Sequence, residues 1–374
     1  MIYSFGNVLA GGGIGTTAYR AVSGLNKAGC LKKVICMDAK KTEIPQEKIR
    51  KCVPFGRQLH ACLEGIRYYI YDAFPSDIIM KELYDRSAMK HVDECDFFYG
   101  WSGHSLHSMQ KAKALGARTV IGGSSSHPLT QLAILEEEYG RYGIRRMIEH
   151  PAVTRKKIAE IDAADFIFAA SEFVAKSMAE NGVPDEKIIV MPTGADTKRF
   201  VPGGKGDGIF RVLFAGTVSL RKGVHYLLDA WSELKLKNSE LVLAGAVGKD
   251  MAWKLRGLKR VKVMGNVADI AAAYRQASLF VFPSLEEGSA KVTYEAMASG
   301  LPIITTFNSG SVVEDGKEGF IIPIRSAKAI TEKIRYFYEN PGELKRMGAR
   351  ARRKAERYDW ISYGKRIAKV LEGL

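Results

Sequence analysis

Short apolar runs that alternate with helical segments along most of the chain constrain its fold more than any other feature. In the first half, strand-like runs occupy residues 2–9, 34–37, 97–101, 119–121 and 166–169, and helical segments occupy residues 16–27 and 106–115. In the second half, such runs occupy residues 211–215, 241–244, 261–263 and 279–282, and helical segments occupy residues 224–234 and 270–275. Short, wholly apolar strands are typical of parallel sheets buried on both faces. The sequence therefore predicts an α/β fold with doubly wound, Rossmann-like sheets.

A stretch at residues 191–208 separates the two alternating halves. It reads MPTGADTKRFVPGGKGDG, and its glycine, proline and charge are typical of an interdomain linker. At 374 residues the chain is long enough for two domains that each bury a core. We therefore predict one domain over residues 1–195 and a second over residues 196–357, facing each other across a cleft.

Composition and the number of cysteines indicate the cellular compartment in which we expect the protein. Hydrophobic residues make up 46% of the chain, but no apolar stretch reaches the roughly 18 residues that span a bilayer. The N-terminus lacks a basic segment followed by an apolar core, so we expect a cytoplasmic protein. The five cysteines are odd in number and form no C-x-x-C pair, which argues against a disulfide framework or a structural zinc site.

The formal net charge of +15 favours anionic partners: a nucleoside diphosphate, a phospholipid surface or nucleic acid. Near the C-terminus, Arg346, Arg350, Arg353 and Arg357 recur at helical spacing and form a basic stripe. The stripe is either a solvated helix face or a contact with an anionic membrane surface. Nucleic acid is the weakest option, because no interleaving of basic and aromatic residues accompanies the charge.

The segment from residue 277 to residue 306 indicates where a ligand binds. Two apolar runs, residues 277–282 and 301–306, flank a loop and a helix, which is the strand, loop, helix, strand unit of a parallel sheet. In such sheets ligands bind beyond the carboxyl ends of the strands. The loop that contains Glu287 begins at such an end, so we expect Glu287 to face the cleft.

The residues of this segment suit a nucleotide sugar. Gly288, Ser289 and Ala290 are small, so a ligand can approach their backbone N–H groups, and Glu295 lies in the helix that follows. A carboxylate there can accept from both hydroxyls of a ribose. The alternative is that Glu287 and Glu295 are solvated charges that favour a helix N-terminus.

The same segment resembles the E-x7-E signature of retaining glycosyltransferases of family 4, written EGFG..LEAMA-GxPVV. The matching run, EGSAKVTYEAMASGLP, extends from Glu287 to Pro302. Ser289 and Ala290 stand where the family more often has Phe and Gly. The resemblance implies that Glu287 holds hydroxyls of the donor sugar and that Glu295 anchors the ribose.

Two adjacent cations, Arg221 and Lys222, come between a predicted strand and a predicted helix. Charge, helix dipole and unpaired N–H groups converge at such a point, which favours a pyrophosphate site over an exposed basic loop. The segment is similar to the family's strand-GR....KG-helix element, which implies that Arg221 and Lys222 neutralise the leaving diphosphate. The family's arginine commonly follows the first glycine directly, and Thr217 occupies that position here.

A glycine-rich loop follows the first predicted strand. Gly11, Gly12 and Gly13 let a ligand approach the backbone, and the family has a loop here that closes over the diphosphate and the acceptor. A competing interpretation is a dinucleotide fingerprint, Gly13-x-Gly15-x-x-Ala18 with Asp38 after the second strand. It predicts an NAD-dependent enzyme but leaves the run from Glu287 and the two cations unexplained.

Further candidates come from three loops. His127 follows the predicted strand at residues 119–121, and its imidazole either bonds a hydroxyl of the donor sugar, as a histidine of the family often does, or caps a helix. His104 is a lesser candidate of the same kind. Gly310 and Ser311 follow the run that ends at Thr306 and begin a predicted helix, so their N–H groups either hold a phosphate or ribose or serve as a cap.

The resemblance covers nearly the whole chain and implies a GT-B fold. In that fold the nucleotide binds mainly the second domain, the acceptor binds the first, and the final helix, here within residues 358–374, packs back on the first domain. The implied reaction moves a sugar from a nucleoside diphosphate to an acceptor hydroxyl with retention by front-face displacement. It implies no cofactor and no metal, because cations replace the metal and the chain has no Asp-x-Asp motif. The acceptor stays open among a saccharide, a lipid and a small metabolite.

Other classes remain open from the sequence. A nucleotide-sugar epimerase or a phosphorylase on the same fold binds the same donor and differs in whether an acceptor hydroxyl is consumed. A non-catalytic binding module uses the same cleft without turnover, and the presence of both glutamates and both cations argues against it.

Overall fold

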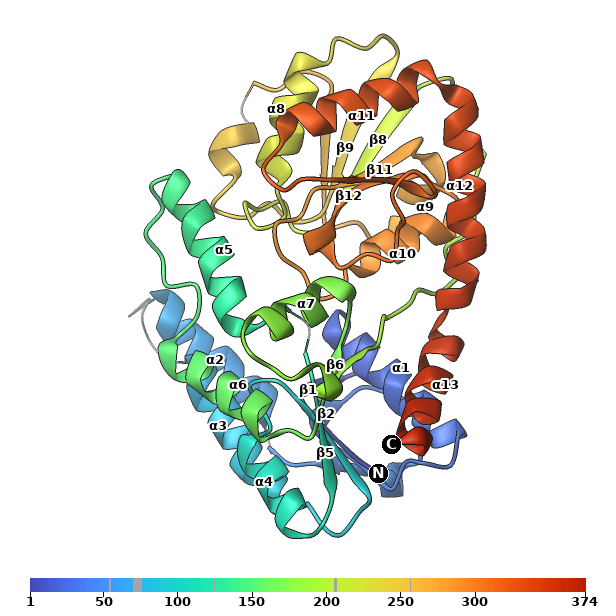
Figure 1. The fold of residues 1–374 in the computed structure, drawn as a ribbon. Helices are drawn as coiled ribbons and strands as arrows, with labels where there is room; N and C mark the ends of the chain where they lie inside the picture. The colour runs from blue at the N-terminus through green and yellow to red at the C-terminus, as the bar shows by residue number, and fades with distance from the viewer. Residues whose placement is uncertain (54, 70–75, 124, 205–206, 256) are drawn as a thin grey trace.

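The computed structural model describes residues 1–374 apart from 54, 70–75, 124, 205–206 and 256. The chain forms two parallel sheets that lie in the lower and upper parts of the molecule in Figure 1, each with helices packed on it. The first sheet has the strand order β3-β2-β1-β4-β5-β6-β7 and the second has the order β10-β9-β8-β11-β12-β13. The predicted α/β fold with two doubly wound halves is confirmed.

The first half extends from β1 to β7. Its strands are β1 Ile2–Leu9, β2 Lys33–Ala39, β3 Ile49–Lys51, β4 Phe97–Trp101, β5 Arg118–Gly122, β6 Phe166–Ala169 and β7 Ile188–Val190. Its helices are α1 Ile14–Lys27, α2 Gly56–Tyr69, α3 Ser76–Met89, α4 Leu106–Ala114, α5 Pro128–Arg141, α6 Pro151–Ala163 and α7 Glu172–Glu180. The sequence did not predict the short edge strands β3 and β7.

The second half extends from β8 to α12, and α13 follows it. Its strands are β8 Phe210–Ala215, β9 Ser239–Ala244, β10 Val261–Gly265, β11 Leu279–Phe282, β12 Ile303–Thr306 and β13 Gly319–Ile322. Its helices are α8 Val224–Glu233, α9 Ile270–Gln276, α10 Lys291–Ala298, α11 Ala327–Glu339 and α12 Pro341–Ala355, and the chain ends with α13 Trp360–Gly373.

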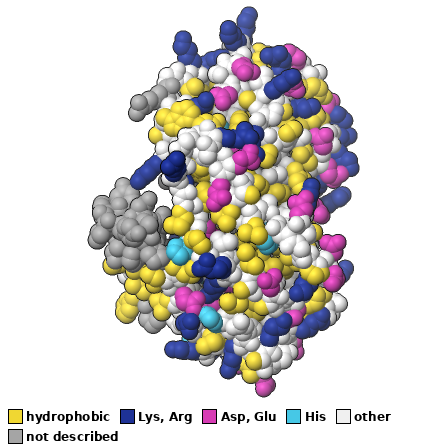
Figure 2. Space-filling model, turned by 60° about the vertical axis from the view of Figure 1, so that its left-hand side comes forward, with side chains coloured by type: hydrophobic (Ala, Val, Ile, Leu, Met, Phe, Trp, Pro, Cys, Tyr) yellow, Lys and Arg dark blue, Asp and Glu magenta, His cyan; other side chains and the backbone are white. Residues whose placement is uncertain are grey.

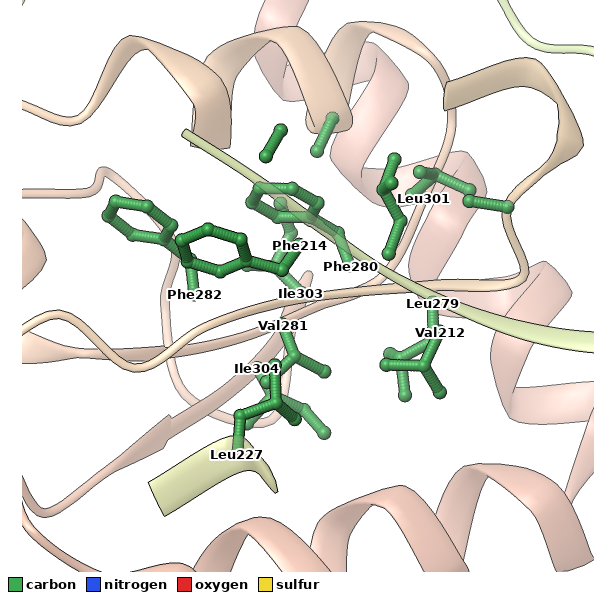
Figure 3. Packing of buried hydrophobic residues seen from close by; sticks show 14 of the residues in the cluster. Val212, Phe214, Leu227, Leu279, Phe280, Val281, Phe282, Leu301, Ile303 and Ile304 are labelled. Atoms are coloured by element: carbon green, nitrogen blue, oxygen red, sulfur yellow. The ribbon is translucent and has the colours of Figure 1, made fainter. Parts of the chain in front are cut away.

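The sheet of the second half is buried on both faces. Figure 3 shows Phe280 and Phe282 of β11 on one side of the strands, and Val281 of the same strand beside Ile304 on the other. The exposed fraction of each of these side chains is at most 1%. Because side chains alternate along a strand, a strand buried on both faces must be apolar at every position. This core fixes the ends of β8 and β11, where the loops of the candidate site begin.

The last helix lies against the first half of the chain. In Figure 1, α12 descends along the right-hand side of the second half and α13 continues beside α1. The two helices meet at Gly24 and Gly364, where a Cβ atom built on Gly24 would lie 2.3 Å from the Cα atom of Gly364. A side chain at either position would force α1 and α13 apart, so this crossing requires glycine on both helices.

Helix α5 belongs to the first half in sequence but packs on the second. Leu135 and Tyr139 are part of the hydrophobic core built around β8 and β11. Glu138, which is fully buried, accepts from the Tyr226 hydroxyl at 2.9 Å and from Arg325 Nε at 2.7 Å. The two halves are therefore joined by the packing of α5 as well as by the linker and α13.

Candidate active site

A cleft of about 420 Å³ lies between the two sheets. The first half lines it with residues from the β1–α1 loop and from the ends of β4, β5 and β6, among them Gly13, Trp101 and Gly123. The second half lines it with Arg221 and Lys222 and with the loop after β11. Both sheets thus turn the carboxyl ends of their strands toward one cavity, as parallel sheets with a ligand site do.

The loop that carries Arg221 and Lys222 is held against the loop after β11. Gly223, which follows the two cations, has a φ of 66°, and a Cβ atom there would lie 2.0 Å from the Pro283 carbonyl oxygen. The Leu285 N–H donates to the Arg221 carbonyl at 2.9 Å. Only glycine permits this close approach, which brings the two cations beside the glutamates of the neighbouring loop.

The structure brings the predicted Lys222 and Glu287 into direct contact. The Lys222 ammonium meets the Glu287 carboxylate, and Arg221 Nη2 lies 3.6 Å from the other oxygen of that carboxylate. Burial and the neighbouring Arg221 guanidinium lower the pKa of Lys222 to about 7. A buried lysine with a low pKa beside a second cation is a site that an additional negative charge would stabilise.

Glu286, for which the sequence predicts no role, connects the two halves. Its carboxylate is fully buried and lies 3.1 Å from Arg221 Nε. It also accepts from the N–H and hydroxyl of Ser126, both at 2.9 Å, and from Gln131 Nε2 at 2.9 Å. Arg221 comes from the second half of the chain, and Ser126 and Gln131 come from the first. The only feature of the sequence that could have indicated this role of Glu286 is its position directly before Glu287.

We expect Glu286→Ala to lower the free energy of unfolding by about 2–4 kcal/mol, because it leaves the Arg221 guanidinium and three donors without their buried acceptor. Urea denaturation followed by circular dichroism measures the change. Glu180→Ala is the matched control, since Glu180 is 59% exposed and its ion pair with Lys176 contributes about 0–1 kcal/mol. Equal effects of the two substitutions would show that Glu286 does not hold the halves together.

Glu295, like Glu287, is half-buried. It comes from α10, and its carboxylate accepts from the Tyr274 hydroxyl at 3.1 Å. Burial raises its pKa to about 7. Glu295 is not among the described residues that line the cleft, whereas Lys291, one helical turn earlier, lines it and donates to the Gly13 carbonyl across the cleft.

Some small residues of the loop after β11 line the cleft, and another is packed behind it. Ser289 and Ala290 line the cleft, and the Ser289 hydroxyl lies 3.1 Å from the Thr193 hydroxyl of the first half. Gly288 is buried behind them. In the β1–α1 loop, Gly13 lines the cleft, Gly12 precedes it, and both have positive φ, of 49° and 92°. A Cβ atom on either would meet no atom within 4 Å, so backbone conformation rather than crowding favours glycine there.

Gly310 and Ser311 differ from the expectation. The segment after β12 is a 3-10 turn over Phe307–Ser309 that ends at Gly310, so no helix begins there. The Gly310 N–H already donates to the Phe307 carbonyl at 3.1 Å. Its φ of 62° brings its backbone against Gly288, whose carbonyl oxygen would lie 2.3 Å from a Cβ atom. Neither residue is among those described as lining the cleft, and tight packing against Gly288 replaces the predicted helix N-terminus.

His127 caps a helix instead of facing the cleft. It precedes α5, is 4% exposed, and its Nδ1 accepts from the Leu129 N–H at 3.3 Å. The backbone N–H of His127 donates to the Ser177 hydroxyl at 2.9 Å. Burial lowers its pKa, which favours a neutral ring. The described lining of the cleft does not include His127.

The acidic residue of the dinucleotide fingerprint does not line the same space as its glycine loop. Asp38, at the end of β2, lies 2.9 Å from the Lys51 ammonium and lines a different hollow from the cleft that contains Gly13. In a dinucleotide site such an acid accepts from the ribose. Among the described residues, no three His, Cys, Asp or Glu side chains gather as a metal site requires.

Comparison with known proteins agrees with the arrangement of the two halves. The chain is 26% identical over 240 residues to the D-inositol 3-phosphate glycosyltransferase of Pseudarthrobacter chlorophenolicus, a match that covers 57% of each protein. The chain thus spans little more than half the length of this relative.

Solved structures show the same fold over the full chain. Sucrose-phosphate synthase from Thermosynechococcus elongatus superposes with a TM-score of 0.69 at 16% identity, covering 100% of this chain and 98% of that one. Anabaena HepE in complex with UDP and glucose superposes with a TM-score of 0.65 at 16% identity, and the match covers 100% of both chains. At this identity the likeness concerns the fold, which is the predicted GT-B fold.

Two family descriptions match the two halves separately. Residues 209–340 match the family described as glycosyl transferases group 1. Residues 11–199, half of the chain, match the family described as glycosyltransferase family 4. The chain therefore belongs to glycosyltransferase family 4.

Proposed function

We propose that this protein transfers a sugar from a nucleoside diphosphate sugar to an acceptor hydroxyl with retention at the anomeric carbon. The observation that carries the proposal is the convergence of Arg221, Lys222 and Glu287 in one cleft between two Rossmann-like halves. Two cations side by side suit a diphosphate, and a carboxylate beside them suits sugar hydroxyls. The second half would bind the donor and the first half the acceptor.

In the proposed reaction the bond between the anomeric carbon and the diphosphate oxygen breaks, and a bond from that carbon to the acceptor oxygen forms on the same face. The acceptor proton passes to the departing diphosphate. Arg221 and Lys222 stabilise the charge that develops on the leaving group, which supplies most of the catalysis. Since these cations take the place of a metal ion, we propose that the reaction needs neither a metal nor a cofactor.

The remaining predicted site residues receive binding roles in this proposal. Glu287 holds hydroxyls of the donor sugar, and Glu295 anchors the ribose once the nucleotide enters. The backbones of Ser289 and Ala290, with those of Gly12 and Gly13 across the cleft, approach the diphosphate and the sugar closely. Gly288, predicted to do the same, supports this loop by packing on Gly310. His127, as a helix cap, orients the loop between β5 and α5 rather than touching the donor.

We select the first substrates to test from the names of similar proteins. HepE was solved with UDP and glucose, so a uridine nucleotide is the first donor to test. Relatives named D-inositol 3-phosphate glycosyltransferase make a small polyhydroxy metabolite the first acceptor. An epimerase or phosphorylase would bind the same donor. An assay that measures both acceptor consumption and the stereochemistry of the product distinguishes these activities from a retaining transferase.

We also propose a cytoplasmic protein that associates peripherally with an anionic membrane surface through α12. Arg353 of α12 and Arg357 of the turn after it are exposed, and Arg346 is exposed but paired with Glu343. Figure 2 shows Lys and Arg side chains mixed with Asp and Glu on the face it draws, without one large basic patch there. None of the described helices is long and apolar enough to cross a bilayer. Sedimentation with anionic vesicles tests the association, and no binding at low salt would refute it.

The first test is thermal unfolding with UDP, GDP, ADP and NAD, each with and without EDTA. A nucleotide at about 100 times its Kd stabilises the folded protein by about 2.7 kcal/mol, which raises the Tm by several degrees. We expect one nucleoside diphosphate to raise the Tm equally with and without EDTA. Stabilisation by NAD alone would replace the proposal with a dinucleotide enzyme, and a diphosphate effect that EDTA abolishes would refute metal independence.

A further inference from the structure

A second cavity of about 150 Å³ opens beside the cleft on the first half of the chain. It shares Ile14, Trp101 and Gly123 with the cleft, so the two spaces lie side by side. No residue of the second half lines the side cavity in the described part of the chain. The side cavity therefore lies on the side of the cleft away from Arg221 and Lys222.

Two lysines from different helices line the side cavity. Lys81 comes from α3 and Lys157 from α6, and their side chains are 11% and 13% exposed. Both stems pass over Gly103, where a Cβ atom would lie 3.2 Å from Lys81 Cε and 3.5 Å from Lys157 Cε. The described lining of the side cavity contains no acidic side chain.

Each lysine keeps hydrogen-bond donors for a ligand. The Lys81 ammonium contacts Asp77, and the Lys157 ammonium lies 2.5 Å from Glu149. An ammonium group has three donors, so one carboxylate partner leaves two of them. The nearby Glu160 carboxylate is fully buried and accepts from the Gly103 and Ser105 N–H groups, which places it behind the loop and not in the cavity.

His104 adds a neutral group to the same wall. Burial and the charge of Lys81 lower its pKa to about 4, so its ring is neutral near pH 7. Its Nδ1 lies 3.2 Å from the Ser102 carbonyl oxygen, which assigns the proton to Nδ1 and leaves a lone pair on Nε2. Asn7 and Ser125 also line the cavity. The wall thus combines two cations with neutral groups that suit hydroxyls.

We propose that this side cavity binds the phosphate of a phosphomonoester acceptor, a small polyhydroxy compound, through Lys81 and Lys157. Each ammonium group, although paired with one carboxylate, retains donors for a phosphate oxygen. Charge-assisted hydrogen bonds of this kind are stronger than neutral ones. With its phosphate there, the acceptor would present a hydroxyl to the cleft past Trp101. This inference rests on the proposed function, because it assigns the acceptor of that reaction.

The experiment measures binding of hexose and cyclitol monophosphates, among them D-myo-inositol 3-phosphate, against their unphosphorylated parents. Calorimetry is carried out with the protein saturated by the nucleoside diphosphate that stabilises it most, so that Arg221 and Lys222 are occupied. We expect at least one monophosphate to bind tenfold or more tightly than its parent. Lys81→Met and Lys157→Met should each weaken that binding about tenfold, because each removes a charged donor but keeps an apolar stem.

Lys176→Met is the matched control, since Lys176 is 62% exposed and lies outside the side cavity. It should leave monophosphate binding unchanged, and none of the three variants should alter nucleotide affinity. Equal affinity for every monophosphate and its parent, or unchanged binding in both cavity variants, would overturn the inference. If no nucleotide binds, the proposed function fails, and the same titrations without nucleotide still decide whether the side cavity takes a phosphomonoester.

Discussion

Lys222→Met is expected to lower kcat by about 10²- to 10³-fold, the usual effect of removing one preorganised group that stabilises developing charge. Lys222 is the cation that contacts Glu287 in the cleft, and methionine keeps most of the length of its side chain without the charge. Steady-state assays with a saturating nucleotide sugar measure the change. Lys317→Met is the control, because Lys317 is 63% exposed and paired with Glu314 away from the cleft.

We also expect the activity of the wild type to depend on pH through the ionisation of Lys222. The pKa of Lys222 is lowered to about 7, so the free protein loses this positive charge as the pH rises through that value. We therefore expect kcat/KM for the donor to fall above about pH 7. A bound diphosphate raises the pKa of the lysine, so the fall in kcat should begin at higher pH. A Lys222→Met variant with the wild-type rate, or with the same alkaline fall, would exclude the leaving-group role.

Glu287→Ala should lower kcat by about 10²- to 10⁴-fold, because two charge-assisted hydrogen bonds to sugar hydroxyls contribute about 1.5–3 kcal/mol each. Nucleoside diphosphate affinity should not fall. In the structure the Glu287 carboxylate contacts the Lys222 ammonium and offsets its charge, so removing it leaves more positive charge for a diphosphate. Turnover assays together with calorimetric titration of the nucleotide separate the two effects.

Glu287→Gln tests the charge alone, because it keeps the size of the side chain and one acceptor oxygen. We expect its rate to lie between those of the wild type and Glu287→Ala, with nucleotide binding at least as tight as in the wild type. If Glu287→Ala turned over at the wild-type rate, the sugar-binding role would be wrong. If instead its nucleotide affinity fell strongly, Glu287 would act through the diphosphate site and not through the sugar.

Much of the fold could be predicted from local sequence. The predicted strands at residues 97–101, 166–169 and 279–282 have the bounds of β4, β6 and β11, because buried parallel strands are apolar at every position and end where polar or small residues begin. The predicted helix after Thr306 was wrong. The turn at Phe307–Ser309 ends in a left-handed Gly310 that packs on Gly288, and no local pattern reports that contact.

The residues of the candidate site were likewise predictable only in part. Arg221, Lys222 and Glu287 were predictable because each lies just beyond the end of a strand, where parallel sheets expose their loops. Glu286 was not, because its partners Ser126 and Gln131 lie 160 and 155 residues away in sequence. The positions of Glu295 and His127 outside the described lining of the cleft likewise depend on which neighbours pack around them.

The sequence by itself determined the α/β class, the two halves and the loops that carry charge, because apolar periodicity and glycine placement act over a few residues. Only the tertiary structure decided which charges meet. The packing of α5 on the second half brings Ser126 to Glu286, and the close approach at Gly223 brings Lys222 to Glu287. The physical reason is that burial and pairing of charge depend on contacts between distant segments, and such contacts leave no periodic signal in the chain.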